Sequence, residues 1–401
     1  MTLRVAVVSS GFEPEHPGGV TNVAIRLIEL LKEEFKTEIT VISFANSRKA
    51  KNSIQFFWPP TYRNKLIVRD LKFKSHKMIS IGTFGSEFEF LRYRKRRKLE
   101  KLFSQFDIII VVTGFLQFAN VIPKVSAPVL VQCATRLVWE RSSQYREMSF
   151  IRKWVLHAQH PAFKLQEIRV LSQVKFFILE NQRMINWIKS HSNAKSCLWY
   201  PTTFKKANEL EGKGQNRMRS HFVSVGRLNE ARKGWGRLLE SYFLAFQSNS
   251  NLPKLVIIGW GDFSIADYAI FERVKEFCPI ILLRNVDNDM RDQYVSNASF
   301  FLQSSFEEGL GLAALEALSC GIPLVCSETD GSIEYLENGQ NGFLVAQGKD
   351  FESRFAKAIL DSQGVDYLTQ SNRSFNLYRD RFGSSVNDSR LFSLLRGLEP
   401  Q

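Results

Sequence analysis

The second half of the chain alternates short apolar segments with helix-forming ones. Strands that alternate with helices of about 10–15 residues form parallel sheets through βαβ crossovers. This alternation predicts an α/β domain with a parallel sheet. The predicted strands lie at residues 221–225, 255–259, 280–283, 298–303 and 342–345, and the helices between them include 265–277 and 289–296.

The first half begins in the same way, with a strand at 4–9, a loop at 11–19, a helix at 20–35 and a strand at 38–44. This order starts a second parallel sheet. Between the halves lies a polar stretch that is poor in large apolar residues, which is typical of a linker. We predict a domain over 1–203, a linker over 204–219, a domain over 220–365, and C-terminal helices over 366–401 that pack back on the first domain.

Residues 304–325 combine a strand end, a glycine-containing turn, a helix and the next strand. Gly309 and Gly311 permit a tight turn and a close approach of backbone to a ligand. Glu308 lies on the turn, and Glu316 lies in the helical run. The amides of residues 309–312 fall at the helix start, where unpaired N–H groups attract hydroxyls and phosphate oxygens. Alone, these residues also fit an ordinary helix start.

The pair Glu308 and Glu316, spaced as E-x7-E around two glycines, resembles the signature of the family 4 retaining glycosyltransferases. That family has the GT-B fold. The resemblance therefore implies two Rossmann-like parallel-sheet domains that face each other across a cleft, with the acceptor on the first and the donor on the second. It implies that Glu316 holds the nucleotide ribose. The donor sugar would be held by Glu308 and by the amides of Gly309, Leu310, Gly311 and Leu312.

A second motif carries the same resemblance. Gly226, Arg227 and Leu228 directly follow a strand, and Lys233 precedes the next helix. A guanidinium can grip two phosphate oxygens, and an ammonium group acts as a compact charge. The G-R-L…K-G pattern resembles the family's diphosphate site, so Arg227, Lys233 and Glu308 are the predicted catalytic residues, with Gly226 in the donor site.

Three further glycines complete the predicted donor site. Gly18 and Gly19 follow the first strand, at the edge of the sheet where ligands of α/β proteins bind. Gly261 stands where the family has a turn that borders the nucleotide base. There is no D-x-D pair in the expected place, and two cations with a helix start can stabilise the leaving diphosphate. We therefore expect no metal and no cofactor.

The acceptor side departs from the family. The family usually carries a histidine after the strand at 128–133, and this chain has none there. Gln132, Thr135 and Arg136 are the nearby polar candidates for acceptor contacts. The missing histidine leaves the acceptor-side catalytic residue open.

The resemblance implies a retaining glycosyltransferase that moves a hexose-type sugar from a UDP- or GDP-sugar to a glycan or glycolipid acceptor in cell-surface polysaccharide or lipopolysaccharide biosynthesis. The alternative is a non-catalytic GT-B protein that binds a nucleotide or a glycan. An NAD-binding oxidoreductase would need G-x-G-x-x-G after the first strand, and the sequence lacks it.

The net charge of +14 implies an anionic partner. Basic residues gather at 62–77 and at 91–101, the latter within a predicted helical run at 87–103, with aromatic residues between them. Such a surface can attract anionic lipid headgroups, although a solvated face has the same composition. No nucleic-acid-binding motif accompanies the charge. The absence of a signal-like start and the five cysteines without a C-x-x-C indicate a cytoplasmic protein. The basic, aromatic surface would place it at the inner face of the cell membrane.

Overall fold

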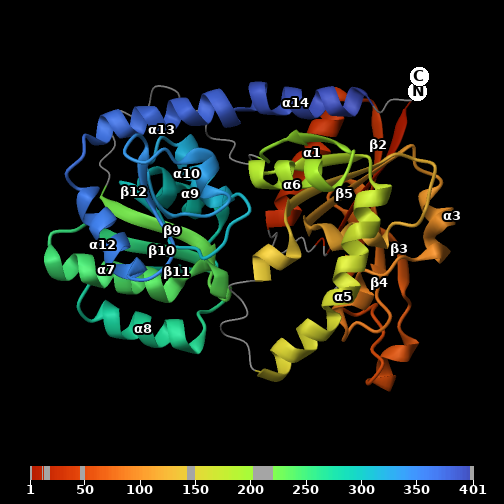
Figure 1. Cartoon of the computed structure of the whole chain (residues 1–401), viewed down its shortest axis with the longest axis horizontal. Coiled ribbons are helices and arrows are strands. Elements are labelled where there is room, and N and C mark those ends of the chain that lie inside the picture. Colours follow the sequence, from red (N-terminus) through yellow and green to blue (C-terminus); the bar gives the residue numbers. More distant parts are fainter. Residues whose placement is uncertain are drawn as a thin grey trace. The chain divides into compact units, whose positions relative to one another are not determined.

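The structure of the protein is a computed structural model that describes residues 2–10, 12, 19–45, 50–141, 150–201 and 220–397. The chain forms two compact units (Figure 1). The first comprises Met1–Trp139, Met148–Thr203 and Asn387–Gln401, and the second comprises Glu140–Glu147 and Phe204–Val386. The predicted linker at 204–219 and Gly18 lie outside the described residues.

The first unit is built on an eight-stranded sheet with the order β3-β4-β2-β1-β5-β6-β7-β8. Its neighbouring strands are parallel except β3 and β4. The central strands are runs of β-branched residues buried on both faces, as parallel sheets require. The strands are β1 (Leu3–Ser10), β2 (Thr37–Ala45), β3 (Ile67–Phe73), β4 (His76–Gly82), β5 (Ile108–Phe115), β6 (Val129–Thr135), β7 (Phe176–Leu179) and β8 (Lys195–Leu198).

The helices of the first unit cover this sheet. The predicted helix at 20–35 is confirmed as α1 (Gly19–Glu34), which buries Val23, Leu27 and Leu30 along one face. The other long helices are α5 (Phe150–Gln173) and α6 (Gln182–His191). Among all helices in the described ranges, none combines the length and the apolar character needed to cross a membrane.

The single helix predicted for residues 87–103 is wrong. The chain instead forms α2 (Glu89–Arg92), the 3-10 turn η2 (Arg97–Leu99) and α3 (Glu100–Phe103). Tyr93 and Leu99 are both buried, although a continuous α-helix would point them about 120° apart. The break lets both join the core and turns Arg96 inward, where its guanidinium donates to the Gly82 carbonyl oxygen and to Thr83 Oγ1. Arg96 therefore does not belong to the predicted basic surface.

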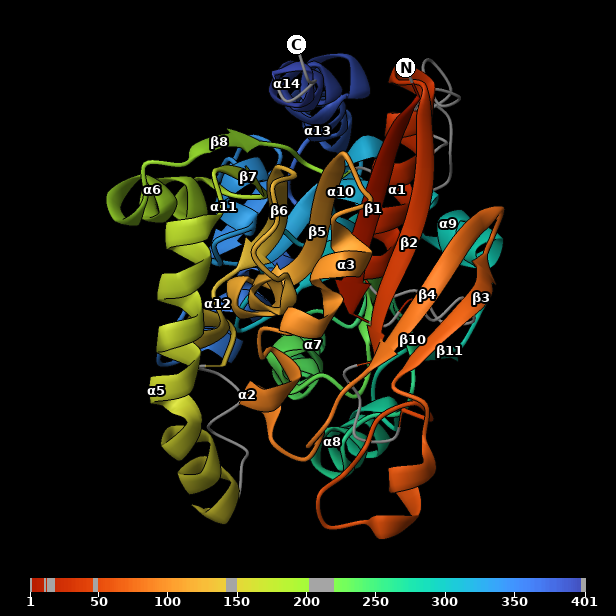
Figure 2. The same cartoon turned by 90° about the vertical axis from the view of Figure 1, so that its right-hand side faces the viewer.

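The basic segment at 62–77 is divided between two ends of a hairpin. β3 pairs antiparallel with β4, so Lys72, Lys74 and Lys77 lie at the turn end. The segment before β3 lies at the other end, roughly 20 Å away along the strands. Figure 2 shows β2, β4 and β3 side by side. Cations at the turn and aromatic residues before β3 therefore form two separate surfaces.

The second unit is built on a six-stranded parallel sheet with the order β11-β10-β9-β12-β13-β14, which confirms the predicted alternation. Helices lie on both faces of this sheet, with α7 and α12 on one face and α10 and α13 on the other (Figure 1). The strands are β9 (His221–Arg227), β10 (Lys254–Trp260), β11 (Ile280–Arg284), β12 (Phe300–Gln303), β13 (Leu324–Ser327) and β14 (Gly342–Val345). The helices are α7 (Trp235–Ser248), α8 (Ile265–Lys275), α9 (Asn288–Ser296), α10 (Leu312–Ser319), α11 (Ser332–Tyr335), α12 (Phe351–Asp361) and α13 (Tyr367–Phe382).

The last two helices belong to different units. α13 packs against α10 of the second unit. From Asn387 onward, α14 (Ser384–Arg396) belongs to the first unit, where the Asn387 side chain accepts from the Tyr200 backbone N–H at 2.9 Å and donates to the Tyr200 carbonyl oxygen. Asp388 accepts from the Trp199 indole at 3.1 Å. Of the described C-terminal residues, those of α14 from Asn387 onward belong to the first unit, whereas α13 belongs to the second.

Candidate functional site

The loops that follow β9 and β12 lie at the carboxyl edge of the six-stranded sheet. β9 and β12 are neighbours, and the strand order reverses between them. In open α/β sheets, ligands bind beyond the carboxyl ends of the strands at such a reversal. Gly226 and Arg227 are the last residues of β9, and Ser304 and Ser305 follow β12. Both predicted motifs therefore lie at one edge of one sheet.

Two glycines let these loops approach closely. Gly234 precedes α7 with φ of 65°, and a Cβ added to it would lie 2.6 Å from the Ser304 carbonyl oxygen. Gly311 precedes α10 with φ of 85°, and an added Cβ would lie 2.6 Å from Tyr335 Oη. A residue with a Cβ fits neither the space nor the backbone conformation. Both glycines are therefore required by the shape of the site.

Glu308 is the buried centre of the site. Lys233 Nζ donates to its Oε1 at 2.5 Å, Arg232 Nη1 donates to its Oε2 at 3.0 Å, and Ser305 Oγ donates to Oε1 at 2.7 Å. Burial alone would raise the pKa of this carboxyl, but the charges of Lys233 and Arg232 outweigh burial and lower its pKa to about 2. Glu308 is therefore ionised and fixed in position at neutral pH.

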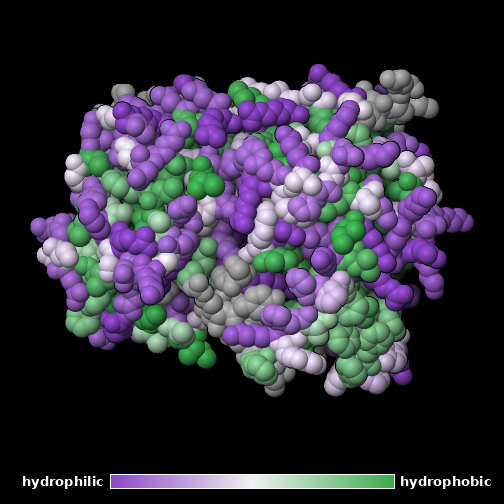
Figure 3. Space-filling model, viewed as in Figure 1, coloured by the Kyte–Doolittle hydropathy of each residue, from purple (hydrophilic) through white to green (hydrophobic). Residues whose placement is uncertain are grey.

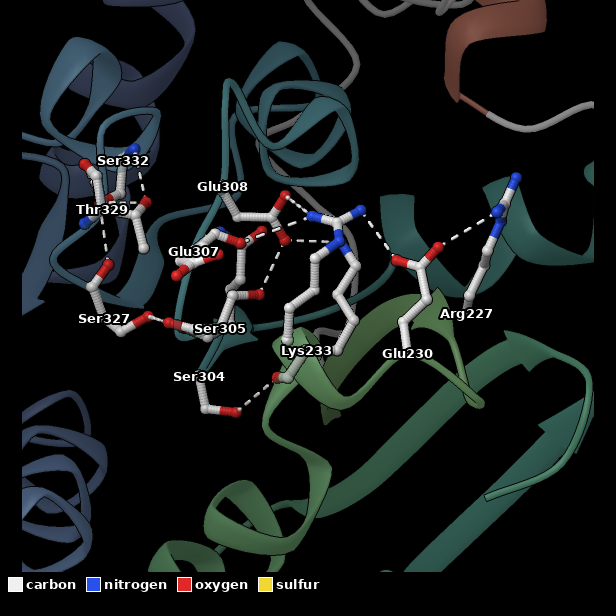
Figure 4. Close-up of polar contacts among 12 residues, drawn as sticks. Arg227, Glu230, Lys233, Ser304, Ser305, Glu307, Glu308, Ser327, Thr329 and Ser332 are labelled. Atoms are coloured by element: carbon white, nitrogen blue, oxygen red, sulfur yellow. Dashed lines mark hydrogen bonds and ion pairs between the residues drawn. The ribbon is translucent and has the colours of Figure 1, made fainter. Parts of the chain in front are cut away.

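Arg232 and Glu230 extend this contact into a row of alternating charges. Figure 4 shows Arg227, Glu230, Lys233 and Glu308 in this row. Arg232 Nη2 lies 2.8 Å from Glu230 Oε2, and Arg227 Nη1 lies 3.1 Å from Glu230 Oε1. Burial would lower the pKa of Arg232, yet the carboxylates of Glu308 and Glu230 raise it overall. The sequence motifs did not single out Arg232 or Glu230; their position between Arg227 and Lys233 was the available signal.

The remaining residues of the predicted E-x7-E stretch lie on the same loop and helix. α10 begins at Leu312, directly after Gly311, so the amides of Gly311 and Leu312 lie at the helix start, and those of Gly309 and Leu310 lie on the turn before it. Glu316 lies inside α10, with Arg291 Nη1 3.8 Å from its Oε2. In the described part of the chain, no group of three or more His, Cys, Asp or Glu side chains is arranged to hold a metal ion.

The other predicted donor-site glycines are placed as follows. Gly261 follows β10 with φ of 80°, and its N–H donates to Asn285 Oδ1 at 3.1 Å. Gly226 lies in β9 against the side chains of Trp235 and Lys233. Gly19 begins α1 in the first unit.

Two of the three predicted acceptor residues are engaged within the first unit. Gln132 is buried in β6 and donates to Glu180 Oε1 at 2.5 Å. Arg136 forms a two-point ion pair with Glu167, at 3.0 and 2.8 Å, and its guanidinium lies 4.0 Å from the centre of the Trp187 ring. Thr135 is the last residue of β6. These contacts give Gln132 and Arg136 structural partners.

Comparison with known proteins agrees with this arrangement. Residues 219–362 match the family model described as Glycosyl transferases group 1. The chain is 26% identical over 183 residues to the capsular polysaccharide biosynthesis glycosyltransferase CapM of Staphylococcus aureus, an alignment that covers 45% of this chain and 47% of CapM. The match thus spans about half the length of that relative.

Two solved structures share the fold over nearly the whole chain. A sucrose-phosphate synthase from Thermosynechococcus elongatus superimposes with a TM-score of 0.67 at 16% identity, covering 99% of each chain. The pneumococcal O-GlcNAc transferase GtfA, solved with UDP and GlcNAc, has a TM-score of 0.64 at 12% identity and covers 100% of each chain. The fold is therefore that of the GT-B glycosyltransferase structures, and residues 219–362 of the second unit match the Glycosyl transferases group 1 model.

Proposed function

We propose that this protein is a family 4 retaining glycosyltransferase that uses a nucleotide diphosphate sugar. One observation carries the proposal: Glu308 is buried, ionised and held by Lys233 and Arg232 at the reversal point of a sheet within a Glycosyl transferases group 1 domain. A glycosyl donor needs cations at its diphosphate and acceptors at its hydroxyls. This edge of the second unit offers both.

Each predicted residue has a physical role in the proposal. Arg227 and Lys233 bind the diphosphate and stabilise the charge that develops as it leaves. Glu308 accepts hydrogen bonds from the sugar hydroxyls, and the backbone amides of 309–312 donate to them. Glu316 accepts hydrogen bonds from the ribose hydroxyls. The departing phosphate takes the acceptor's proton, which gives retention without a dedicated carboxylate base. These steps require no metal ion.

We propose a UDP- or GDP-linked hexose as the donor and a glycan or glycolipid of the cell surface as the acceptor. The complex of GtfA with UDP and GlcNAc supports a uridine nucleotide, and the role of CapM in capsular polysaccharide biosynthesis supports the class of acceptor. Cys197, Cys278 and Cys326 carry free thiols, which is consistent with a reducing compartment.

We also propose that the first unit docks on an anionic membrane surface at the cytoplasmic face. The aromatic segment before β3 supports this, because Phe57 is 74% exposed and Trp58 is 59% exposed, with exposed Arg63 and Lys65 following. Figure 3 shows apolar side chains gathered beside the ends of β3 and β4. Aromatic rings and cations together suit the interface of an anionic bilayer.

Vesicle sedimentation tests this docking. The Phe57→Ser/Trp58→Ser variant should lose binding to vesicles that contain phosphatidylserine, because those rings enter the headgroup region. Substituting Lys72, Lys74 and Lys77 by Gln at the hairpin turn serves as the matched control and should reduce binding less. Equal binding by the wild type to neutral and anionic vesicles would contradict the proposal.

A thermal-shift panel of UDP-, GDP-, ADP- and CMP-sugars tests the donor site. A ligand at a hundred-fold excess over its Kd stabilises the folded state by about 2.7 kcal/mol. We expect a shift with one nucleotide class that Arg227→Ala and Glu316→Ala both reduce. Nucleotide binding without transfer to any acceptor would favour the non-catalytic alternative, which the missing acceptor-side histidine supports.

A further inference from the structure

In the structure, both cations of the proposed diphosphate site already face a carboxylate. Lys233 Nζ is bonded to Glu308, and Arg227 Nη1 lies 3.1 Å from Glu230. Arg232 joins the two carboxylates, at 2.8 Å from Glu230 and 3.0 Å from Glu308. Three cations and two carboxylates thus form one connected row with a net charge of one positive unit (Figure 4).

The two ends of this row differ in exposure. The Glu308 and Lys233 side chains are 5% and 15% exposed, whereas Arg227 is 51% exposed and Glu230 is 24% exposed. A buried pair is costly to break, while a half-exposed pair opens at little cost. The Arg227–Glu230 pair is therefore the part of the row that can yield to an incoming anion.

We infer that Glu230 is a built-in counter-anion that competes with the donor diphosphate for Arg227 and so limits the affinity of the site for nucleotides. The inference rests on the proposed function, because it assumes that Arg227 binds the diphosphate. A diphosphate that reaches Arg227 displaces Glu230 from it, and Glu230 keeps its ion pair with Arg232. When the nucleoside diphosphate leaves, Glu230 pairs with Arg227 again.

Glu230 is well suited to this role because Arg232 fixes it beside the site. The turn that carries it is short: the Lys233 N–H donates to the Glu230 carbonyl oxygen at 3.0 Å, and the Phe306 N–H donates to the Arg232 carbonyl oxygen at 2.7 Å. The first of these bonds closes the turn, and the second ties the loop after β9 to the loop after β12. The Glu230 carboxylate therefore stays near Arg227 whether or not the two are paired.

Calorimetric titration with free UDP and GDP tests the inference. Glu230→Gln keeps the shape of the side chain and removes its charge, and we expect it to bind the preferred nucleotide about five-fold more tightly, the effect of losing one partly exposed ion pair. Glu240→Gln is the matched control, since Glu240 pairs with Arg273 on the surface of the same unit. That variant should bind as the wild type does.

A double-mutant cycle with Arg227→Ala separates the inference from the proposed function. In the Arg227→Ala background, Glu230→Gln should no longer tighten binding, because the contested cation is gone. If Glu230→Gln binds equally or more weakly while Arg227→Ala still loses affinity, Glu230 orients Arg227 and the inference is overturned. If neither nucleotide binds, or if Arg227→Ala changes nothing, the proposed diphosphate site itself is wrong.

Discussion

Two glutamates buried at the carboxyl edges of the two sheets are held in opposite ways. Glu308, in the second unit, has a pKa lowered to about 2, whereas Glu180, which follows β7 in the first unit, has a pKa raised to about 7. Burial raises the pKa of both carboxyls. Lys233 and Arg232 overcome burial at Glu308, but at Glu180 the hydrogen bond from the neutral Gln132 only offsets part of it.

This difference shows what each edge is built for. The edge of the second unit concentrates paired charges, which suits a charged ligand. The polar groups seen at the first unit's edge are matched to one another, as with Gln132 and Glu180 or Arg136 and Glu167. The comparison therefore predicts that removing the charge of Glu308 damages function, whereas removing that of Glu180 alters only stability.

Removing the charge of Glu308 should have the largest effect. We expect Glu308→Gln to lower kcat/KM for sugar transfer by about 10³-fold, the upper range for losing one polar group that acts in a transition state. The amide cannot hold Lys233 and Arg232 by charge, and it presents a donor where the sugar needs an acceptor. Steady-state transfer assays would check this, with Glu240→Gln as the control. If the Glu308→Gln variant kept a third of the wild-type kcat/KM, Glu308 would have no catalytic role in sugar transfer.

Neutralising Glu180 should have the next largest effect, and it should increase the stability of the folded protein. The pKa of Glu180 rises from 4.5 to about 7 on folding, so the folded state favours its protonated form. The associated stability is fully present below pH 4.5 and is lost as the pH rises through 7, a change of about 3 kcal/mol. Glu180→Gln should therefore unfold at higher urea concentration than the wild type at pH 8, and at nearly the same concentration at pH 4.5.

Glu308 should give the opposite pH dependence of stability and so serves as a control for Glu180. The lowered pKa of Glu308 stabilises the folded state above pH 4.5, and this contribution is lost as the pH falls toward 2. Acid unfolding near pH 3 should thus be less steep in Glu308→Gln, while Glu180→Gln leaves it unchanged. Loss of stability in Glu180→Gln at pH 8 would mean that Glu180 is ionised and paired in the folded protein.

The sequence predicted the structure best where neighbouring residues along the chain determine it. The strands and helices of the second unit follow one another at short spacing, so the loops after β9 and β12 could be located from the chain alone. The G-R-L…K-G and E-x7-E motifs then predicted that Lys233 and Glu308 would share one edge of the sheet, and the two are in contact. Their chemical roles stay predictions.

Contacts between distant residues could not be predicted in this way. Arg232 and Glu230 are two charges in a polar loop, and only folding brings Arg232 to Glu308, 76 positions later. The run at 87–103 has helical composition, but the helix is interrupted, and Arg96 bonds to Gly82 and Thr83, which precede it by 14 and 13 positions. The periodicity of apolar residues predicts which side of a helix or strand is buried. It does not predict which other helix or strand packs against that side.

The smallest expected effect on stability comes from a contact between two residues that are far apart in the sequence. Asn387 in α14 bonds to both backbone groups of Tyr200, which precedes it by 187 positions. Asn387→Ala leaves those buried groups unpaired and should destabilise the first unit by about 2 kcal/mol without changing nucleotide binding. Scanning calorimetry would measure the shift, with the exposed Ser385→Ala as the control in the same helix. If the Asn387→Ala and Ser385→Ala variants have the same melting temperature, the contact between Asn387 and Tyr200 does not hold α14 on the first unit. Polar contacts inside the first unit would then contribute less to its stability than we infer from the pairs Gln132–Glu180 and Arg136–Glu167.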